Sequence, residues 1–149
     1  MELEKEIHSK NFEDNYQKAV INVSYTYNWI SNILRNRLEK HNITQQQFNI
    51  LRILRGQLPN PSTVNLLKER MIDKMCDASR MVDRLVQKEL VTRCTNSKDR
   101  RAVDIYISEE GLKVLAQIDQ ELKLGDILRH NISEEEATVL SNLLDKLRG

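Results

Sequence analysis

The chain has 149 residues, 40% of them hydrophobic, which is enough for one core and fits a single domain. Only four glycines and two prolines interrupt many strong helix formers, so we expect a mainly helical fold. The net charge of +1 is unevenly spread, because residues 68–101 hold ten basic and six acidic side chains, whereas residues 102–149 hold five and ten. A polyanion would therefore bind the middle third, although a solvated charged surface explains the same balance.

Several classes of protein are excluded by what the chain lacks. No run of about 18 apolar residues could span a membrane, so we expect a soluble, cytoplasmic protein without a membrane partner. Two cysteines cannot make a disulfide framework, and the three histidines lack metal-site spacing, so no metal or other cofactor is expected. No nucleophile–base grouping or glycine-rich phosphate loop is present, and the glutamates at 134–136 suit the start of a helix, so an enzyme is not expected.

The first predicted element is a long amphipathic helix over residues 10–40, in which apolar side chains recur at steps of three or four. These side chains are Phe12, Tyr16, Val20, Val23, Tyr27, Ile30, Leu34 and Leu38. A helix of that length spans about 40 Å, as wide as a whole small domain. Part of its apolar stripe should therefore lie outside the chain's own core, where a partner subunit could cover it.

A capping box formed by Thr44 and Gln47 predicts the start of a second helix, which ends near Gly56. The stretch 58–61 is a predicted turn, with Asn60 as a cap and Pro61 at the first position of the following helix. Residues 64–71 then predict a short helix with inward leucines.

Asp73 is the predicted cap of another helix, which runs to about residue 89. The apolar face of that helix comprises Met75, Ala78, Val82, Leu85 and Val86. Two helices joined by almost no linker indicate a helix-turn-helix.

Residues 90–94 and 102–107 predict two strands, the second from its alternation of apolar and other residues. Between them lies a polar, basic loop of the kind called a wing. Ser108 is expected to begin a further helix, with Glu109 and Glu110 in its first turn. A second capping box, Ser133 with Glu136, predicts a last helix with an apolar side.

This order of elements resembles the MarR family of bacterial regulators. The specific matches are residues 79–85, similar to the family's recognition helix, residues 90–93, similar to the first wing strand, and Asp99-Arg100-Arg101 followed by Ile105, Ile107, Ser108 and Gly111. One departure is Glu89, where the family commonly has glycine before this leucine.

The resemblance implies a mainly α fold with a small β-hairpin (α+β), in a single domain over residues 1–149. Residues 44–107 would form the winged DNA-binding lobe, with the helix-turn-helix at 62–89 and the wing at 90–108. Residues 10–40 and 112–149 would form dimerisation helices. The implied function is a homodimeric transcription regulator, expected to be a repressor, on a pseudopalindromic operator. The sequence itself leaves the operator, the regulated genes and the sign of regulation open.

A recognition helix presents side chains near its N-terminal half to base edges in the major groove. We predict base contacts from Cys76, Asp77, Ser79 and Arg80 and a phosphate contact from Arg84, with further phosphate contacts from Ser62, Thr63 and Lys68 on the preceding helix. In the wing, Lys98, Arg100 and Arg101 are the predicted contacts, and the resemblance makes Arg100 the one that enters the minor groove. Asp99 is expected to orient Arg100 or Arg101 through a salt bridge.

Two further hypotheses concern regulation. Tyr16, Tyr27 and Trp29, with Tyr25, could line a pocket for a small aromatic effector, although core packing is the commoner role of such residues. Cys76 near a helix N-terminus could act as a redox sensor, but no resolving cysteine is evident. The main alternative to DNA binding is a winged-helix dimer used for protein association, which would have no need for three basic residues in the wing.

Overall fold

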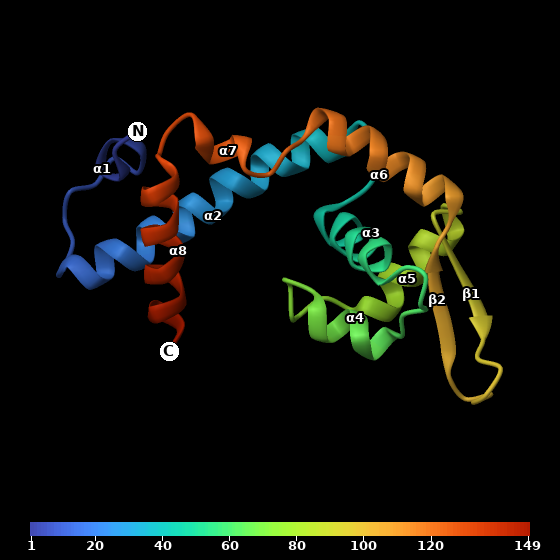
Figure 1. Ribbon diagram of the computed structural model, residues 1–149. Coiled ribbons are helices and arrows are strands. Elements are labelled where there is room, and N and C mark those ends of the chain that lie inside the picture. Colours follow the sequence, from blue (N-terminus) through green and yellow to red (C-terminus); the bar gives the residue numbers. More distant parts are fainter.

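The computed structural model describes all residues, 1–149, as helices with one two-stranded antiparallel sheet (Figure 1). The helices are α1 Leu3–Glu6, α2 Asn15–Glu39, α3 Gln45–Gln57, α4 Val64–Arg70, α5 Ala78–Gln87, α6 Glu109–Glu121, α7 Asp126–Arg129 and α8 Glu134–Arg148, and the strands are β1 Val91–Thr95 and β2 Val103–Ile107. The mainly α fold with a small hairpin is confirmed. None of the helices is both long and apolar enough to cross a membrane.

The hydrophobic core lies in the lobe formed by α3 to α6 and the hairpin. Its 18 buried residues all fall between Leu38, at the end of α2, and Leu122, just after α6. Helix α8 buries none of its residues, and α2 buries only Ser31 and Leu38. The N-terminal part of α2 and α8 lie at the far end of the molecule from the hairpin (Figure 1).

The long first helix is shorter than predicted. It begins at Asn15, because the Asp14 carboxylate caps it by accepting from the backbone N–H of Gln17 at 2.8 Å, so Phe12 lies outside the helix. The short helix α1, which the apolar periodicity did not indicate, is joined to α2 by an ion pair between Glu4 and Lys18 at 2.6 Å.

The capping box that begins α3 is confirmed, with Thr44 and Gln47 bonded reciprocally. The predicted caps of the next helix are wrong. Asn60 and Pro61 precede α4, whose cap is Thr63, because the intervening Ser62 pairs with the sheet.

The junction between α4 and α5 is longer than the sequence suggested. Asp77, rather than Asp73, caps α5, and its carboxylate accepts from the backbone N–H of Arg80 at 3.1 Å. Asp73 instead forms a turn, with its side chain accepting from the backbone N–H of Met75 at 3.0 Å. Met75 is therefore not on the apolar face of the helix, and its side chain is 94% exposed.

The hairpin pairs β1 with β2 in register from Val91 opposite Ile107 to Thr95 opposite Val103. Ser62 forms an isolated antiparallel β-bridge with Ile105, through two backbone hydrogen bonds of 2.9 Å. The base of the wing is thereby attached to the segment that leads into α4.

The end of α5 explains the departure at Glu89. This residue has a φ of 60°, a left-handed conformation that favours glycine. The backbone N–H of Glu89 bonds to the carbonyl of Val86 and that of Leu90 to the carbonyl of Leu85, the pattern of a Schellman motif. The chain therefore adopts the left-handed backbone conformation with a glutamate, at the position where the MarR family commonly has glycine.

Replacing Glu89 with glycine is expected to raise the free energy of unfolding by about 0.5–1 kcal/mol, because it removes the strain of a left-handed side-chain residue. Equilibrium urea denaturation at one fixed protein concentration measures the difference. Glu89→Ala, which keeps the Cβ, is the control and should not stabilise. Equal stability of the glycine and alanine variants would contradict the strain argument.

The molecule exposes far more surface than a self-contained chain of its size. Its accessible area is 11072 Å², whereas a folded monomer of this mass exposes about 7,900 Å². Much of the exposed apolar area lies on one stripe of α2 and on α8; the members are Tyr16, Val20, Val23, Tyr27, Val139, Leu140, Leu143 and Leu147. The expectation that part of the first helix's stripe lies outside the core is confirmed.

Candidate nucleic-acid interface

Helix α5 is the second helix of the helix-turn-helix, and its outer face is exposed. Its inner side chains Ala78, Val82 and Leu85 are buried in the lobe. On the outer side Ser79, Arg80 and Arg84 are exposed. The helix therefore presents a hydroxyl and two guanidinium groups to a partner.

The basic side chains of residues 68–101 separate into two groups. Four are bonded within the protein: Arg70 to Gln57, Lys74 to the carbonyl of Glu69, Lys88 to Gln47 and the carbonyl of Asn42, and Arg93 to Asp83. The other six have no ion pair and no side-chain hydrogen bond, and all are exposed: Lys68, Arg80, Arg84, Lys98, Arg100 and Arg101. These six unpaired cations are the same basic residues that the sequence predicted as DNA contacts.

The wing loop is shaped by side chains that bond to its backbone. The Asn96 side-chain oxygen accepts from the backbone N–H groups of Lys98 and Asp99, and its amide donates to Asp104 at 3.0 Å. The Asp99 carboxylate accepts from the backbone N–H of Arg101 at 2.9 Å. The predicted salt bridge from Asp99 is wrong, because this carboxylate bonds the Arg101 backbone and leaves the guanidinium groups of Arg100 and Arg101 free.

Two of the predicted phosphate contacts, Ser62 and Thr63, lie before α4 rather than on it. Ser62 is 1% exposed and bridged to β2, so its prediction as a phosphate contact is wrong. Thr63 is exposed, but its hydroxyl oxygen already accepts from the backbone N–H of Leu66 at 3.2 Å as the cap of α4. Its hydroxyl hydrogen remains available as a donor.

Cys76 and Asp77 precede α5 rather than lying on it. Asp77 is occupied as the helix cap, and Cys76 is half-buried. Burial raises the pKa of the Cys76 thiol, and the neighbouring Asp73 and Asp77 carboxylates raise it further. A raised pKa keeps the thiol protonated, which opposes the reactivity that a redox sensor requires.

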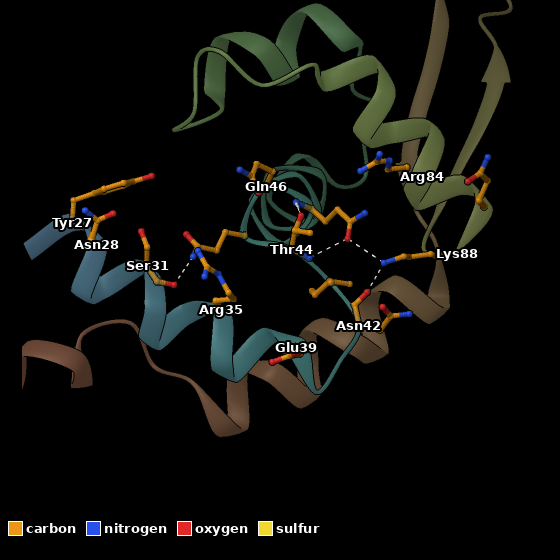
Figure 2. Close-up of a pocket in the computed structure, with 14 residues that line it drawn as sticks. Tyr27, Asn28, Ser31, Arg35, Glu39, Asn42, Thr44, Gln46, Arg84 and Lys88 are labelled. Atoms are coloured by element: carbon orange, nitrogen blue, oxygen red, sulfur yellow. Dashed lines mark hydrogen bonds between the residues drawn. The ribbon is translucent and has the colours of Figure 1, made fainter. Parts of the chain in front are cut away.

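A polar cavity of about 780 Å³ lies between α2, the start of α3 and the end of α5 (Figure 2). Only Tyr27 and Ile43 among its 14 lining residues are hydrophobic. Its charged side chains are the cations Arg35, Arg84 and Lys88 and a single acid, Glu39. The cavity therefore carries an excess of positive charge.

The aromatic residues predicted as an effector pocket are not brought together, and that prediction is wrong as a group. Tyr27 lies at the edge of the polar cavity, while Trp29 and Tyr25 line a separate hollow beside α1. Tyr16 lines neither and is 84% exposed. Trp29 lies on the opposite side of α2 from Tyr27, because two residues turn a helix by about 200°, whereas Tyr16 shares the stripe of Tyr27 but lies about three turns away.

Lys88, just after α5, makes contacts with distant residues that the sequence analysis did not predict. Its ammonium group donates to the carbonyl of Asn42 and, at 3.2 Å, to the side-chain oxygen of Gln47 (Figure 2). Gln47 in turn belongs to the capping box of α3. The end of α5 is thus tied both to α3 and to the segment that joins α2 and α3. The bond to Gln47 joins residues 41 positions apart, which no local pattern indicates.

The fold and this surface define a winged-helix protein with unpaired basic residues on its second motif helix and wing. Residues 43–103 match the model of the MarR family. This part of the chain is therefore similar to the MarR family, whose members are transcription regulators.

Several known proteins are similar to this chain in sequence or in fold. The chain is 25% identical over 132 residues to the transcriptional regulator MhqR of Bacillus subtilis, covering 87% of this chain and 89% of MhqR. It is 38% identical over 76 residues to the repressor MdtR of the same species, covering 50% of this chain and only 46% of MdtR. A mutant of MarR from E. coli, solved with operator DNA, has the same fold, with a TM-score of 0.77, 24% identity and coverage of 93% and 99% of the two chains.

Proposed function

We propose that the protein is a homodimeric repressor that binds a pseudopalindromic operator, with α5 in the major groove and the wing in the minor groove. The observation that carries the proposal is the set of six unpaired cations, because exposed arginine and lysine side chains without internal partners suit phosphate and base contacts. MdtR, a repressor, and MarR, solved with operator DNA, support it by similarity. A regulator of this kind acts on cytoplasmic DNA, which is where we expect this protein.

The exposed apolar stripe of α2 and α8 supports the proposed dimer. An isologous dimer would cover the same stripe on both copies and would reduce the large accessible surface of the single chain. It would also place two copies of α5 about 34 Å apart, one turn of the duplex.

Selection from random duplex DNA, at fixed near-physiological salt and with the protein's size measured alongside, tests the proposal. We expect a dimer that enriches a palindrome. Arg80→Ala should weaken binding about tenfold or more and relax the preference at one base pair in each half-site, because arginine pairs bidentately with guanine. Arg100→Ala should weaken binding and reduce its salt dependence.

Arg129→Ala is the matched control, because Arg129 is 76% exposed at its side chain and lies on α7, outside the lobe. It should leave DNA binding unchanged. Weak binding that enriches no sequence would favour the protein-association module instead. Unchanged affinity and salt dependence for Arg100→Ala would remove the wing from the interface.

We also propose that an effector of this regulator is a small hydrophilic anion held in the polar cavity. Its lining of amides, hydroxyls and three cations suits a carboxylate or phosphate better than an aromatic compound. Such an anion would compete for the Lys88 ammonium group, which ties the recognition helix to α3. Loss of that tie would allow α5 to move relative to the rest of the lobe and weaken operator binding.

Citrate is a suitable probe of this cavity. We expect millimolar citrate to raise the melting temperature and weaken operator binding more than sodium chloride of equal ionic strength. Arg35→Gln should weaken both responses about tenfold, since a hydrogen bond to a charged group contributes about 1.5–3 kcal/mol. Arg37→Gln, on the same helix but outside the cavity lining, should leave both unchanged. Stabilisation by phenol and not by citrate would support the aromatic effector instead.

A further inference from the structure

The loop between α4 and α5 exposes two large apolar side chains beside the recognition helix. Ile72 is 86% exposed and Met75 is 94% exposed. Neither belongs to the stripe of α2 and α8 that a dimer would cover. Large apolar side chains exposed together in a folded lobe indicate a surface that contacts something else.

The loop holds this exposed position through its backbone. The backbone N–H of Ile72 donates to the side-chain oxygen of Asn49 at 2.9 Å, and that of Met75 donates to the Asp73 carboxylate at 3.0 Å. Gln46 on α3 also donates to Asp73 at 3.4 Å. Met71, which precedes Ile72, is buried in the core. The loop is therefore held on both sides of Ile72, and its backbone keeps the Ile72 and Met75 side chains pointing outward.

Met75 lies two residues before Asp77, the cap of α5. It therefore adjoins the N-terminal end of that helix, where Ser79 and Arg80 lie. A recognition helix enters the major groove with this end. The exposed Lys74 next to Met75 supplies a positive charge at the same edge. The apolar surface is thus continuous with the proposed DNA interface.

The major groove has one apolar feature that a side chain can read, the methyl group of thymine. A methionine side chain is unbranched and polarisable, so it adapts to such a methyl group without needing a fixed rotamer. We propose that Met75 contacts a thymine methyl group in each half-site and so makes the regulator prefer a T·A base pair there. This inference rests on the proposed function, because it requires an operator.

The test uses the operator obtained by selection, with each thymine replaced in turn by uracil, which removes only the methyl group. For the wild-type dimer, uracil at the contacted position of one half-site should weaken binding about fourfold, and at that position of both half-sites about 15-fold, because each replacement loses the burial of one methyl group. Met75→Ala should bind the thymine operator more weakly by a similar factor and should no longer distinguish uracil from thymine at that position.

Because Met75 is exposed and its side chain contributes nothing to the core, Met75→Ala should keep the wild-type melting temperature. Leu124→Ala, which truncates an exposed apolar residue after α6, is the control and should retain the uracil effect. A Met75→Ala variant that still distinguishes uracil at the same position would overturn the inference, as would a wild type insensitive to every uracil. Failure to select any operator would instead remove the proposed function, and this inference with it.

Discussion

Gly111→Ala is expected to lower the free energy of unfolding by about 3 kcal/mol or more, because the added methyl group has no space. A Cβ at this position would lie 2.3 Å from the carbonyl oxygen of Leu90 and 2.8 Å from Cγ1 of Ile107. The first of these atoms is backbone and already accepts from the backbone N–H of Ser108 at 3.0 Å. Relief would therefore require α6 to move away from the corner between α5 and β1.

Gly56→Ala is the matched control, because the same methyl group meets nothing within 4 Å there. Gly56 lies within α3, where alanine should stabilise the protein by about 0.5–1 kcal/mol. Urea denaturation at one fixed protein concentration measures both variants. A loss below about 1 kcal/mol for Gly111→Ala would contradict the close packing of α6 against Leu90.

Leu143→Glu is expected to weaken the proposed homodimer at least about 100-fold, and operator binding with it. Leu143 is 58% exposed in the single chain and belongs to the apolar stripe of α8. In a symmetric dimer each substitution occurs twice, and burying an unpaired carboxylate costs several kcal/mol. A monomer would also lose the second half-site.

Analytical ultracentrifugation over a range of concentrations measures the dimer, and a binding titration with the selected operator measures the function. The control is Ser141→Glu, on the opposite side of α8, which adds the same charge and should leave both unchanged. A Leu143→Glu protein that remains dimeric would place the interface elsewhere.

The predictions that proved correct rest on patterns that are local in sequence. Thr44 with Gln47, and Ser133 with Glu136, form their capping boxes as predicted, because each box satisfies backbone groups within four residues. The antiparallel hairpin follows from apolar alternation and a polar loop. The basic residues of α5 and the wing were identified from local charge and from the resemblance, and their contacts with DNA stay a prediction.

The wrong predictions concern positions where the sequence allows two local structures. Asp73 and Asp77 are both suitable caps, and the choice of Asp77 places Met75 outside the helix; the bonds from Asn49 and Gln46 hold the preceding loop in that arrangement. Ser62 looks like an exposed hydroxyl in sequence. Its backbone pairing with Ile105, 43 positions along, is what buries it.

The sequence by itself determined the class of fold, the order of its elements and the basic residues predicted to bind DNA, because helical periodicity, capping and charge are properties of neighbouring residues. Only the tertiary structure decided which cations are unpaired, which residues surround the polar cavity, and that Glu89 must adopt a left-handed backbone. Those outcomes depend on contacts between distant segments, such as Lys88 with Gln47 or Leu90 with Gly111. Such contacts exist only once the core has brought the helices together.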